Sequence, residues 1–174
     1  MEKIRYFKSF LNIFQPKLSL KNIYELTPAH LKTLKIKGII IDFDNTLLSH
    51  KEHFVEPDIK KWLKTFQEQK FKICIVSNSY SRSKKKIAEN LKIPFIWRAI
   101  KPKQKAFKQA MKMFKLSPKE TAVIGDQLFT DVLGGNRLGL YTVLVAPISK
   151  NEFFGLKIVR ILERFILKKL KTEN

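Results

Sequence analysis

The run Gly38-Ile39-Ile40-Ile41-Asp42-Phe43-Asp44-Asn45-Thr46 joins three consecutive isoleucines directly to two carboxylates. Continuous β-branched residues without polar alternation are typical of a strand that is buried on both faces, as in a parallel sheet. Because side chains alternate along an extended chain, Asp42 and Asp44 are expected on the same side where this strand ends. The run therefore predicts an interior strand that brings two carboxylates to one edge of a sheet.

Short β-branched runs alternate with longer amphipathic stretches as far as Val145, which is the pattern of strand-helix-strand units around a parallel sheet. Right-handed connections place all strand carboxyl ends at one edge, where such sheets bind ligands. We therefore expect an α/β fold, a three-layer Rossmann-like parallel sheet with helices on both faces. The predicted strands are 37–42, 71–77, 95–98, 121–125 and 141–145, and the predicted helices are 57–69, 81–90, 102–114 and 130–138.

The length of 174 residues predicts a single domain with a sizeable core. We expect the sheet to occupy about 35–148, preceded by an amphipathic segment over 1–34 and followed by a basic amphipathic helix over 152–172. The lone Cys74 lies in an apolar run and is interpreted as a packed thiol. No run is long enough to span a bilayer and no signal peptide is recognisable, so a cytoplasmic location is expected.

The formal net charge is +20. Such an excess predicts attraction to an anionic partner, which could be nucleic acid, an acidic lipid surface or a phosphorylated substrate. Charge alone does not choose among these three. The lysines are scattered through the whole chain, so compositional bias without a function is an alternative interpretation.

The carboxylates Asp42 and Asp44 suit phosphoryl transfer. One of them can attack phosphorus, while the other protonates the leaving alkoxide and later activates water. Taken alone, two aspartates at this spacing after a strand are also typical of a turn or a cation-binding pair. The second predicted strand ends in Ser77-Asn78-Ser79, whose hydroxyl and amide can bind a phosphoryl oxygen, although both residue types are common in turns.

Two further strand ends supply charged groups. Lys101 precedes the third predicted helix and could neutralise the nucleophile and the phosphate, although one lysine in a lysine-rich chain means little by itself. Asp126 ends the fourth strand, and Asp131 follows five residues later. Mg²⁺ prefers one or two carboxylates together with phosphate and water. We therefore predict that Asp42 and Asp126 hold Mg²⁺, with the main-chain carbonyl of Asp44 as a third ligand.

The ordered segments Asp42-Phe43-Asp44-Asn45-Thr46-Leu47, Ser77-Asn78-Ser79, Lys101-Pro102 and Gly125-Asp126-Gln127 resemble the four motifs of the haloacid dehalogenase-like hydrolases. The resemblance covers nearly the whole chain and agrees in order, spacing and strand context. The roles that it implies are nucleophile for Asp42, general acid/base for Asp44, phosphoryl binding for Ser77 with Asn78 beside it, charge neutralisation for Lys101 with Lys103 in reserve, magnesium binding for Asp126, and support from Thr46 and Asp131.

Within that superfamily, a carboxylate at the Asp44 position is carried by phosphatases and phosphotransferases, whereas dehalogenases lack it. The chain has room only for a short flap (47–56) and one helix between Asp44 and Ser77, and for a helix and a short strand between Ser77 and Lys101. No cap domain fits in either interval. A site without a cap stays open to a large or surface-bound substrate.

A closer resemblance is to the YqeG-like family, which is related to the mitochondrial phosphatidylglycerophosphate phosphatases. It is carried by the leader Tyr24-Glu25-Leu26-Thr27-Pro28, by Lys101-Pro102, and by Gly125-Asp126-Gln127-Leu128-Phe129-Thr130-Asp131-Val132-Leu133-Gly134-Gly135-Asn136-Arg137. The segment after Pro147 departs from the pattern and is only loosely recognisable in 160–164. The resemblance implies a phosphorylated lipid, phosphatidylglycerophosphate, as the substrate.

The two ends of the chain carry amphipathic patterns. A helical projection of the last segment predicts a basic stripe opposite large apolar residues, which is typical of a helix on anionic lipid. The alternative is a helix packed on the sheet with a solvated basic face. The stripe consists of Lys157, Arg160, Arg164, Lys168 and Lys171, and it faces Phe154, Ile158, Ile161, Leu162, Phe165 and Ile166. Near the N-terminus, Phe7, Phe10, Leu11 and Phe14 are predicted to contact the same membrane.

These observations predict a Mg²⁺-dependent phosphate monoester hydrolase with a phospho-aspartate intermediate on Asp42. We expect it to dephosphorylate phosphatidylglycerophosphate as a peripheral protein on the inner face of an anionic membrane. One alternative is a phosphatase that acts on nucleic acid ends or on a soluble monoester, because an open basic site suits those partners too. A binding module without turnover is the other alternative, and the intact carboxylates Asp42, Asp44 and Asp126 argue against it.

Overall fold

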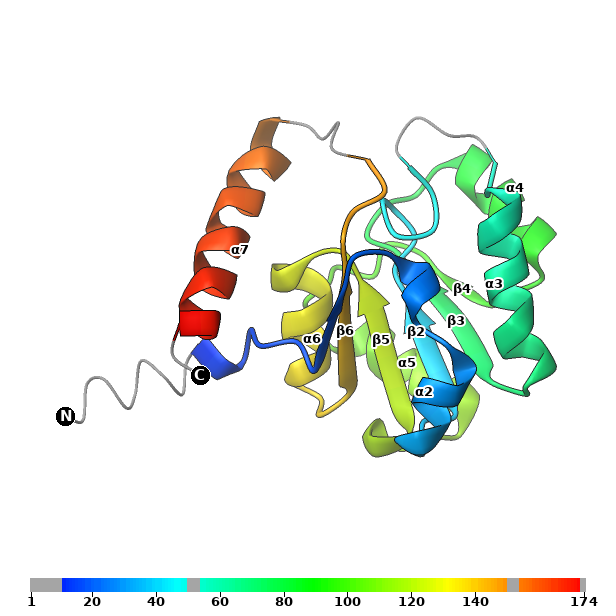
Figure 1. Cartoon of the computed structure of the whole chain (residues 1–174). Helices are drawn as coiled ribbons and strands as arrows, with labels where there is room; N and C mark the ends of the chain where they lie inside the picture. The colour runs from blue at the N-terminus through cyan, green and yellow to red at the C-terminus, as the bar shows by residue number, and fades with distance from the viewer. Residues whose placement is uncertain (1–10, 50–53, 150–153, 173–174) are drawn as a thin grey trace.

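The computed structural model of the protein describes residues 11–49, 54–149 and 154–172 (Figure 1). Its centre is a six-stranded sheet in the order β1-β6-β5-β2-β3-β4, in which all pairings are parallel. The predicted α/β fold with a parallel sheet is therefore confirmed. The strands are β1 (Leu18–Leu20), β2 (Gly38–Ile41), β3 (Lys72–Val76), β4 (Phe95–Ile96), β5 (Thr121–Gly125) and β6 (Tyr141–Val145).

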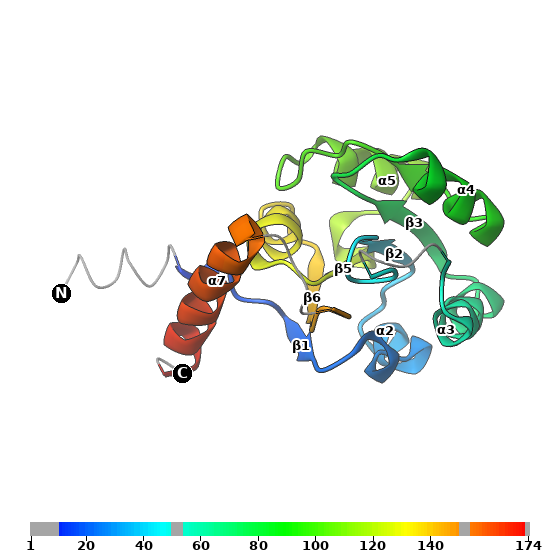
Figure 2. The same cartoon turned by 90° about the horizontal axis from the view of Figure 1, so that it is seen from above.

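Helices cover both faces of the sheet (Figure 2). The α-helices are α2 (Pro28–Thr33), α3 (Pro57–Glu68), α4 (Arg82–Leu91), α5 (Lys105–Phe114), α6 (Leu133–Asn136) and α7 (Phe154–Thr172). Short 3₁₀ turns form η1 (Ile23–Glu25) and η2 (Pro118–Glu120), and a π-helical turn, η3 (Leu128–Val132), leads into α6. Leucine and aromatic residues of α2 and α3 pack on one side of the sheet, and those of α5 pack on the other.

The isoleucine run forms the central strand because both of its faces are buried. Ile39 and Ile41 join the core beneath α3, whereas Ile40 joins the core beneath α5, and all three side chains are fully buried. The register pairs Gly38 with Lys72 of β3 and with Thr121 of β5. The carboxyl ends of β2, β3 and β5 therefore lie level with one another at one edge of the sheet.

Strand β4 and helix α5 are shorter than predicted. β4 has two residues instead of four, because Arg98 and Ile100 adopt positive φ angles of 49° and 54°, which end an extended strand. Helix α5 begins at Lys105 and not at residue 102. The prediction for Cys74 is confirmed, since its thiol is buried and burial raises its pKa to about 12.

The segment before the first predicted strand contributes to the folded domain. β1 pairs with β6 at the edge of the sheet, and Thr27 caps α2 by accepting a hydrogen bond from the His30 N–H. Leu11 and Phe14 are buried in a cluster that includes Leu170 of α7. Their predicted contact with a membrane is therefore wrong, because their apolar surfaces are already covered. Phe7 and Phe10 lie outside the described residues.

Candidate active site

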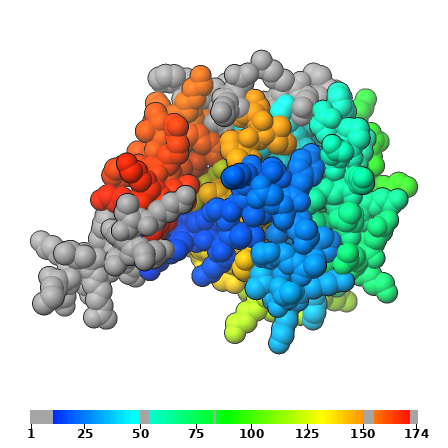
Figure 3. Space-filling view, viewed as in Figure 1, coloured from blue at the N-terminus to red at the C-terminus, as the bar shows by residue number. Residues whose placement is uncertain are grey.

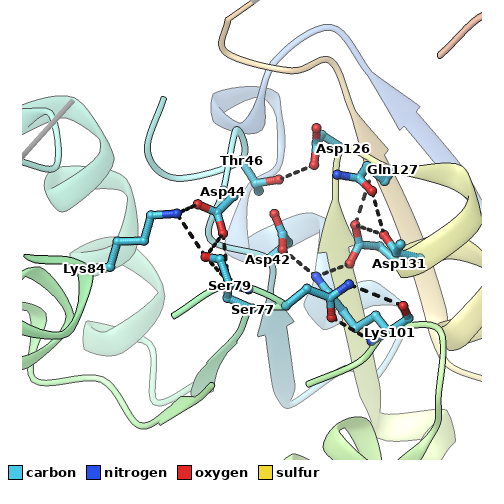
Figure 4. Close-up of polar contacts among 12 residues, drawn as sticks. Asp42, Asp44, Thr46, Ser77, Ser79, Lys84, Lys101, Asp126, Gln127 and Asp131 are labelled. Carbon is cyan, nitrogen blue, oxygen red and sulfur yellow. Dashed lines mark hydrogen bonds and ion pairs between the residues drawn. The ribbon is translucent and has the colours of Figure 1, made fainter. Parts of the chain in front are cut away.

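The end of β2 places Asp42 inside the domain, beside the lysine that follows the β4 turn (Figure 4). The Asp42 N–H donates to the Ile124 carbonyl at 2.8 Å, so the ladder between β2 and β5 continues to this residue. Lys101 Nζ donates to Asp42 Oδ1 and, at 2.7 Å, to Asp131 Oδ1. The predicted Lys101 is thus brought to the nucleophile candidate, whereas the reserve candidate Lys103 is exposed.

The charges of this buried group depend on one another. Burial raises the pKa of Asp42, and the nearby Asp131 and Asp126 raise it further, while Lys101 opposes the shift only in part. Burial by itself would lower the pKa of Lys101, but the Asp131 and Asp42 carboxylates outweigh it and hold that pKa above its usual value. A protonated lysine therefore lies between two buried acidic side chains, Asp42 and Asp131.

Asp131 reaches Lys101 because β5 ends in a glycine. A Cβ atom at Gly125 would lie 2.2 Å from Asp131 Cγ, so any side chain at that position would displace the carboxylate. The other Asp131 oxygen, Oδ2, accepts from Thr130 Oγ1 at 3.2 Å and from the Gln127 N–H at 3.4 Å. Thr130 lies in the π-helical turn η3, and Gln127 directly precedes it; such turns often occur at functional sites.

Asp126 is the third carboxylate at this edge. Thr46 Oγ1 donates to Asp126 Oδ1 at 3.2 Å, and the guanidinium of Arg160 donates to Asp126 Oδ2 and to the Asp126 main-chain carbonyl. Burial raises the pKa of Asp126 to about 6, although Arg160 opposes the shift. Thr46 is therefore placed to orient this carboxylate, and its supporting role in catalysis stays a prediction.

The buried carboxylates fit a divalent cation. Oxygens of Asp42, Asp126 and Asp131 lie within 4.8 Å of one another, and Asp42 Oδ2 is a buried oxygen without a hydrogen-bond partner among the described residues. Among the described residues, the four acidic side chains Asp42, Asp126, Asp131 and Glu163 pair with two cations, Lys101 and Arg160, so the formal charge of this group is −2. Oxygen ligands and this charge are what a hard divalent cation requires.

Asp44 lies on the side of Asp42 that faces away from Asp126 and Asp131, among serine hydroxyl groups (Figure 4). Its Oδ2 accepts from Ser77 Oγ at 2.8 Å and from Ser79 Oγ at 2.5 Å, and its Oδ1 accepts from Lys84 Nζ. Burial tends to raise the pKa of Asp44, but the hydrogen bonds from Lys84, Ser79 and Ser77 outweigh it and lower that pKa. Asp44 is thus held in its ionised form in this arrangement.

Asn78 is arranged differently from its predicted position on the phosphate. Its side chain exchanges two hydrogen bonds with the main chain of Lys101: the Lys101 N–H donates to Asn78 Oδ1 at 2.6 Å, and Asn78 Nδ2 donates to the Lys101 carbonyl at 3.3 Å. The side chain therefore fixes the loop that carries Lys101. Binding of phosphate by Asn78 stays a prediction.

Asn45 connects the loop after β2 to the segment that follows β6. It adopts φ of 64°, a left-handed conformation that asparagine tolerates better than most residues. Its side chain accepts from the Ser149 N–H at 2.8 Å and donates to the Ser149 carbonyl at 2.9 Å. The segment after β6 is thereby bound to the loop of Asp42 and Asp44.

The predicted basic stripe on the last helix is wrong at Arg160, which faces the interior in α7. Arg160 points inward to Asp126 and pairs with Glu163 at 2.9 Å, and Glu163 accepts from the N–H groups of Leu128 and Phe129 at the start of η3. Arg160 therefore belongs to the site and not to a solvated face. Helix α7 packs on the domain through Leu167 and Leu170, while Ile158, Ile161, Leu162 and Phe165 are 48–59% exposed.

Sequence reasoning missed three residues of the site: Lys84, Glu163, and Arg160 in its true position. The Ser81-capped start of α4 turns Lys84 toward Asp44, but one lysine among the three at 84–86 gives no signal in the sequence. Glu163 could have been suspected as the only carboxylate within the basic helix. None of the described helices is long and apolar enough to cross a membrane.

The chain is similar in sequence to known phosphatases. Residues 6–148 match the family described as mitochondrial PGP phosphatase. The chain is 44% identical over 161 residues to the probable phosphatase YqeG of Bacillus subtilis. This alignment covers 92% of this chain and 94% of that protein. It is 30% identical over 167 residues to phosphatidylglycerophosphate phosphatase 1, chloroplastic/mitochondrial, of Arabidopsis thaliana. That alignment covers 88% of this chain and 47% of the Arabidopsis protein.

A solved structure shares the fold. The cobalt-bound form of the deoxy-D-mannose-octulosonate 8-phosphate phosphatase from Haemophilus influenzae matches with a TM-score of 0.55 and 17% identity, over 79% of this chain and 90% of that chain. The sheet, the ordered motifs and the sequence relatives agree on the family. The chain belongs to the mitochondrial PGP phosphatase family and is a phosphatase of the haloacid dehalogenase superfamily.

Proposed function

We propose that the protein is a Mg²⁺-dependent phosphate monoester hydrolase that works through a phospho-aspartate on Asp42. The observation that carries the proposal is the position of Asp42: buried beside Lys101, with one oxygen bound to the lysine and the other without a partner among the described residues. A carboxylate held in this way has an oxygen available to attack phosphorus. Asp44, two residues further along, provides the proton-transfer group.

In the first step, the free oxygen of Asp42 attacks phosphorus while the bond from phosphorus to the alcohol oxygen breaks. The hydrogen bonds from Lys84, Ser79 and Ser77 favour ionised Asp44 in the absence of substrate, so Asp44 first takes up a proton from solvent. It then gives that proton to the departing oxygen, and the products are the free alcohol, a phospho-aspartate and an ionised Asp44. In the second step, Asp44 takes a proton from water, and the water oxygen attacks phosphorus. The Asp42 carboxylate and inorganic phosphate are released, and Asp44 is again protonated.

The remaining residues act on charge and position. We assign Asp42, Asp126 and the Asp44 carbonyl as the protein ligands of Mg²⁺, whose positive charge lets a dianionic phosphate approach Asp42. Lys101 neutralises Asp42 and the transferring group, and Asp131 orients that lysine at 2.7 Å. Ser77, with Asn78 behind it, binds a phosphoryl oxygen.

The proposed substrate is phosphatidylglycerophosphate, which is dephosphorylated to phosphatidylglycerol at the inner surface of an anionic membrane. Support comes from the family match and from the name of the Arabidopsis relative. The exposed apolar residues of α7 alternate with Lys157, Arg164 and Lys168, which suits a peripheral contact with acidic lipid. Among the described residues, the connections before and after β3 are short and hold no cap domain, which suits a substrate embedded in a membrane.

The test is phosphate release from a panel of substrates. The panel contains phosphatidylglycerophosphate in anionic vesicles, a 5′-phosphorylated oligonucleotide and an aryl phosphate, each with Mg²⁺ and with excess chelator. We expect the lipid to be the best substrate, the chelator to abolish turnover, and mass spectrometry of quenched protein to find a phosphoryl group on Asp42. A preference for the oligonucleotide would overturn the lipid assignment, and full turnover in chelator would overturn the role of Mg²⁺.

A further inference from the structure

A groove of about 730 Å³ separates α7 from the edge of the sheet formed by β1 and β6. In the space-filling view it lies between the orange-to-red α7 and the blue β1 (Figure 3). Its volume is within the range of small-molecule sites, which are mostly apolar with a few placed polar groups. Apolar side chains supply most of the lining: Leu20, Leu128, Leu144, Val145, Ile161 and Leu167.

The polar groups of the groove are concentrated on α7 and are mainly cationic. Lys157, Arg160 and Arg164 line it, against only two carboxylates, Asp126 and Glu163. Both carboxylates pair with Arg160, and the five charged side chains of the lining sum to a formal charge of +1. The positive charge of the groove therefore lies at Lys157 and Arg164. An occupant that matches this surface combines hydrocarbon with negative charge.

The groove reaches from the outer surface of α7 to the candidate active site. Ile161 lines it and is also 58% exposed, so the apolar lining continues onto the outward face of the helix. At its inner end the lining includes Asp126, the carboxylate that faces Asp42 and Asp131. A ligand in the groove would therefore extend from the membrane-facing side of α7 toward the reacting groups.

We infer that this groove binds the hydrocarbon part of an anionic phospholipid substrate, with Lys157 and Arg164 on α7 attracting the lipid's negative charge. The identity of the ligand as substrate rests on the proposed function. The location and the amphiphilic character of the site rest on the lining alone. A phospholipid fits better than a peptide because hydrocarbon needs no hydrogen-bond partners from the apolar walls.

The first experiment fills the groove. Ser19 and Ala146 line it, and both are exposed, so S19W and A146W add bulk to the groove without displacing a buried side chain. L162W is the matched control, because Leu162 is exposed on α7 but does not line the groove. We expect the groove variants to raise KM for long-chain phosphatidylglycerophosphate at least tenfold, and to hydrolyse an aryl phosphate within twofold of the parent.

The second experiment measures binding without turnover. Calorimetric titration with oleoyl lysophosphatidylglycerol below its micelle concentration should show one site, which A146W abolishes and the double variant K157Q/R164Q weakens at least fivefold. K112Q, which removes a charge from the exposed side of α5, should bind as the parent does. The smaller A146L, with thermal melting to verify the fold, replaces A146W if the tryptophan disturbs the domain.

The two proposals fail in different ways. If no phospholipid is hydrolysed but the lysolipid still binds in a groove-dependent manner, the substrate assignment is wrong and the amphiphile site stands. If phosphatidylglycerophosphate is hydrolysed and S19W, A146W and L162W all behave as the parent, the groove inference is wrong. Loss of lysolipid binding in L162W but not in A146W would place the contact on the outward face of α7.

Discussion

Two lysine-carboxylate groups lie on either side of the end of β2, and they differ in their access to water. The side chains of Lys101 and Asp42 are 3% and 7% exposed, and Asp131 contacts the same lysine. The side chains of Lys84 and Asp44 are 21% and 16% exposed, at the start of α4. The first group is more deeply enclosed, by the sheet and η3, whereas the second is more open to solvent.

The pKa values of the two aspartates shift in opposite directions for this reason. Burial dominates for Asp42 and raises its pKa, whereas hydrogen bonds from Lys84, Ser79 and Ser77 overcome burial for Asp44 and lower its pKa. A nucleophile must stay fixed, and an acid/base group must exchange protons in every turnover. The comparison therefore predicts that mutations in the enclosed group have larger effects than mutations in the open one.

The largest effect is expected for Asp42→Asn, because an amide of the same shape cannot attack phosphorus. Phosphate release should fall by more than about 10⁴-fold. The melting temperature should be equal or higher, since a carboxylate that repels Asp131 and Asp126 is removed. Asp58→Asn, at an exposed carboxylate in the first turn of α3, is the control and should keep full activity. A folded Asp42→Asn protein within tenfold of the parent would contradict the mechanism.

Lys101→Met should affect stability as well as turnover. It leaves Asp42 and Asp131 buried without their shared cation, which costs about 3–5 kcal/mol when one partner of a buried pair is removed. Urea unfolding of the variant measures this loss in the free energy of unfolding. Lys103→Met, two residues away and exposed, should change it by less than about 0.5 kcal/mol. Equal stabilities of the two variants would show that Lys101 is not held as described.

Asp44→Asn should reduce turnover by about 10² to 10⁴-fold for an alkyl phosphate, because general acid catalysis is worth that much. An aryl phosphate has a good leaving group and needs less protonation, so the defect should be smaller with it. Steady-state rates with the two substrates provide the measurement. A defect of the same size with both would indicate that Asp44 acts on binding and not on proton transfer.

The smallest effect is expected for Lys84→Met. Removing the Lys84 ammonium takes away a hydrogen bond and a positive charge, so the pKa of Asp44 should rise. The first step needs protonated Asp44, so kcat/KM declines as pH rises through this pKa. The variant should therefore move that decline to higher pH, with kcat/KM at neutral pH within about tenfold of the parent.

Lys85→Met is the matched control for that variant. Lys85 is the next residue on α4 and lies near Glu89 instead of Asp44. Its pH profile should coincide with that of the parent. A decline that moves equally in both variants would mean that the general charge of α4, and not the contact with Asp44, controls the titration.

Much of the site could be predicted from sequence because it follows from strand geometry. Continuous isoleucines require a strand buried on both faces, and a parallel sheet brings the residues after β2, β3 and β5 to one edge whatever the rest of the chain does. Asp42, Ser77 and Asp126 meet for this reason. The three-residue β1 was not predictable, because its side-chain pattern is too short to show a period.

Only the tertiary structure decided the direction of the side chains on α7 and α4. A helical projection groups Arg160 with Lys157 and Arg164 by angle, but it contains no information about which face packs on η3. Arg160 turns inward because Asp126 and Glu163 would otherwise be buried without a cation. Leaving these carboxylates unpaired would cost more free energy than removing the guanidinium from water. Asn78 turns to the main chain of Lys101 and Lys84 turns to Asp44 in the same way. Local sequence therefore determined which groups arrive at the sheet edge, and long-range packing determined which partner each group contacts.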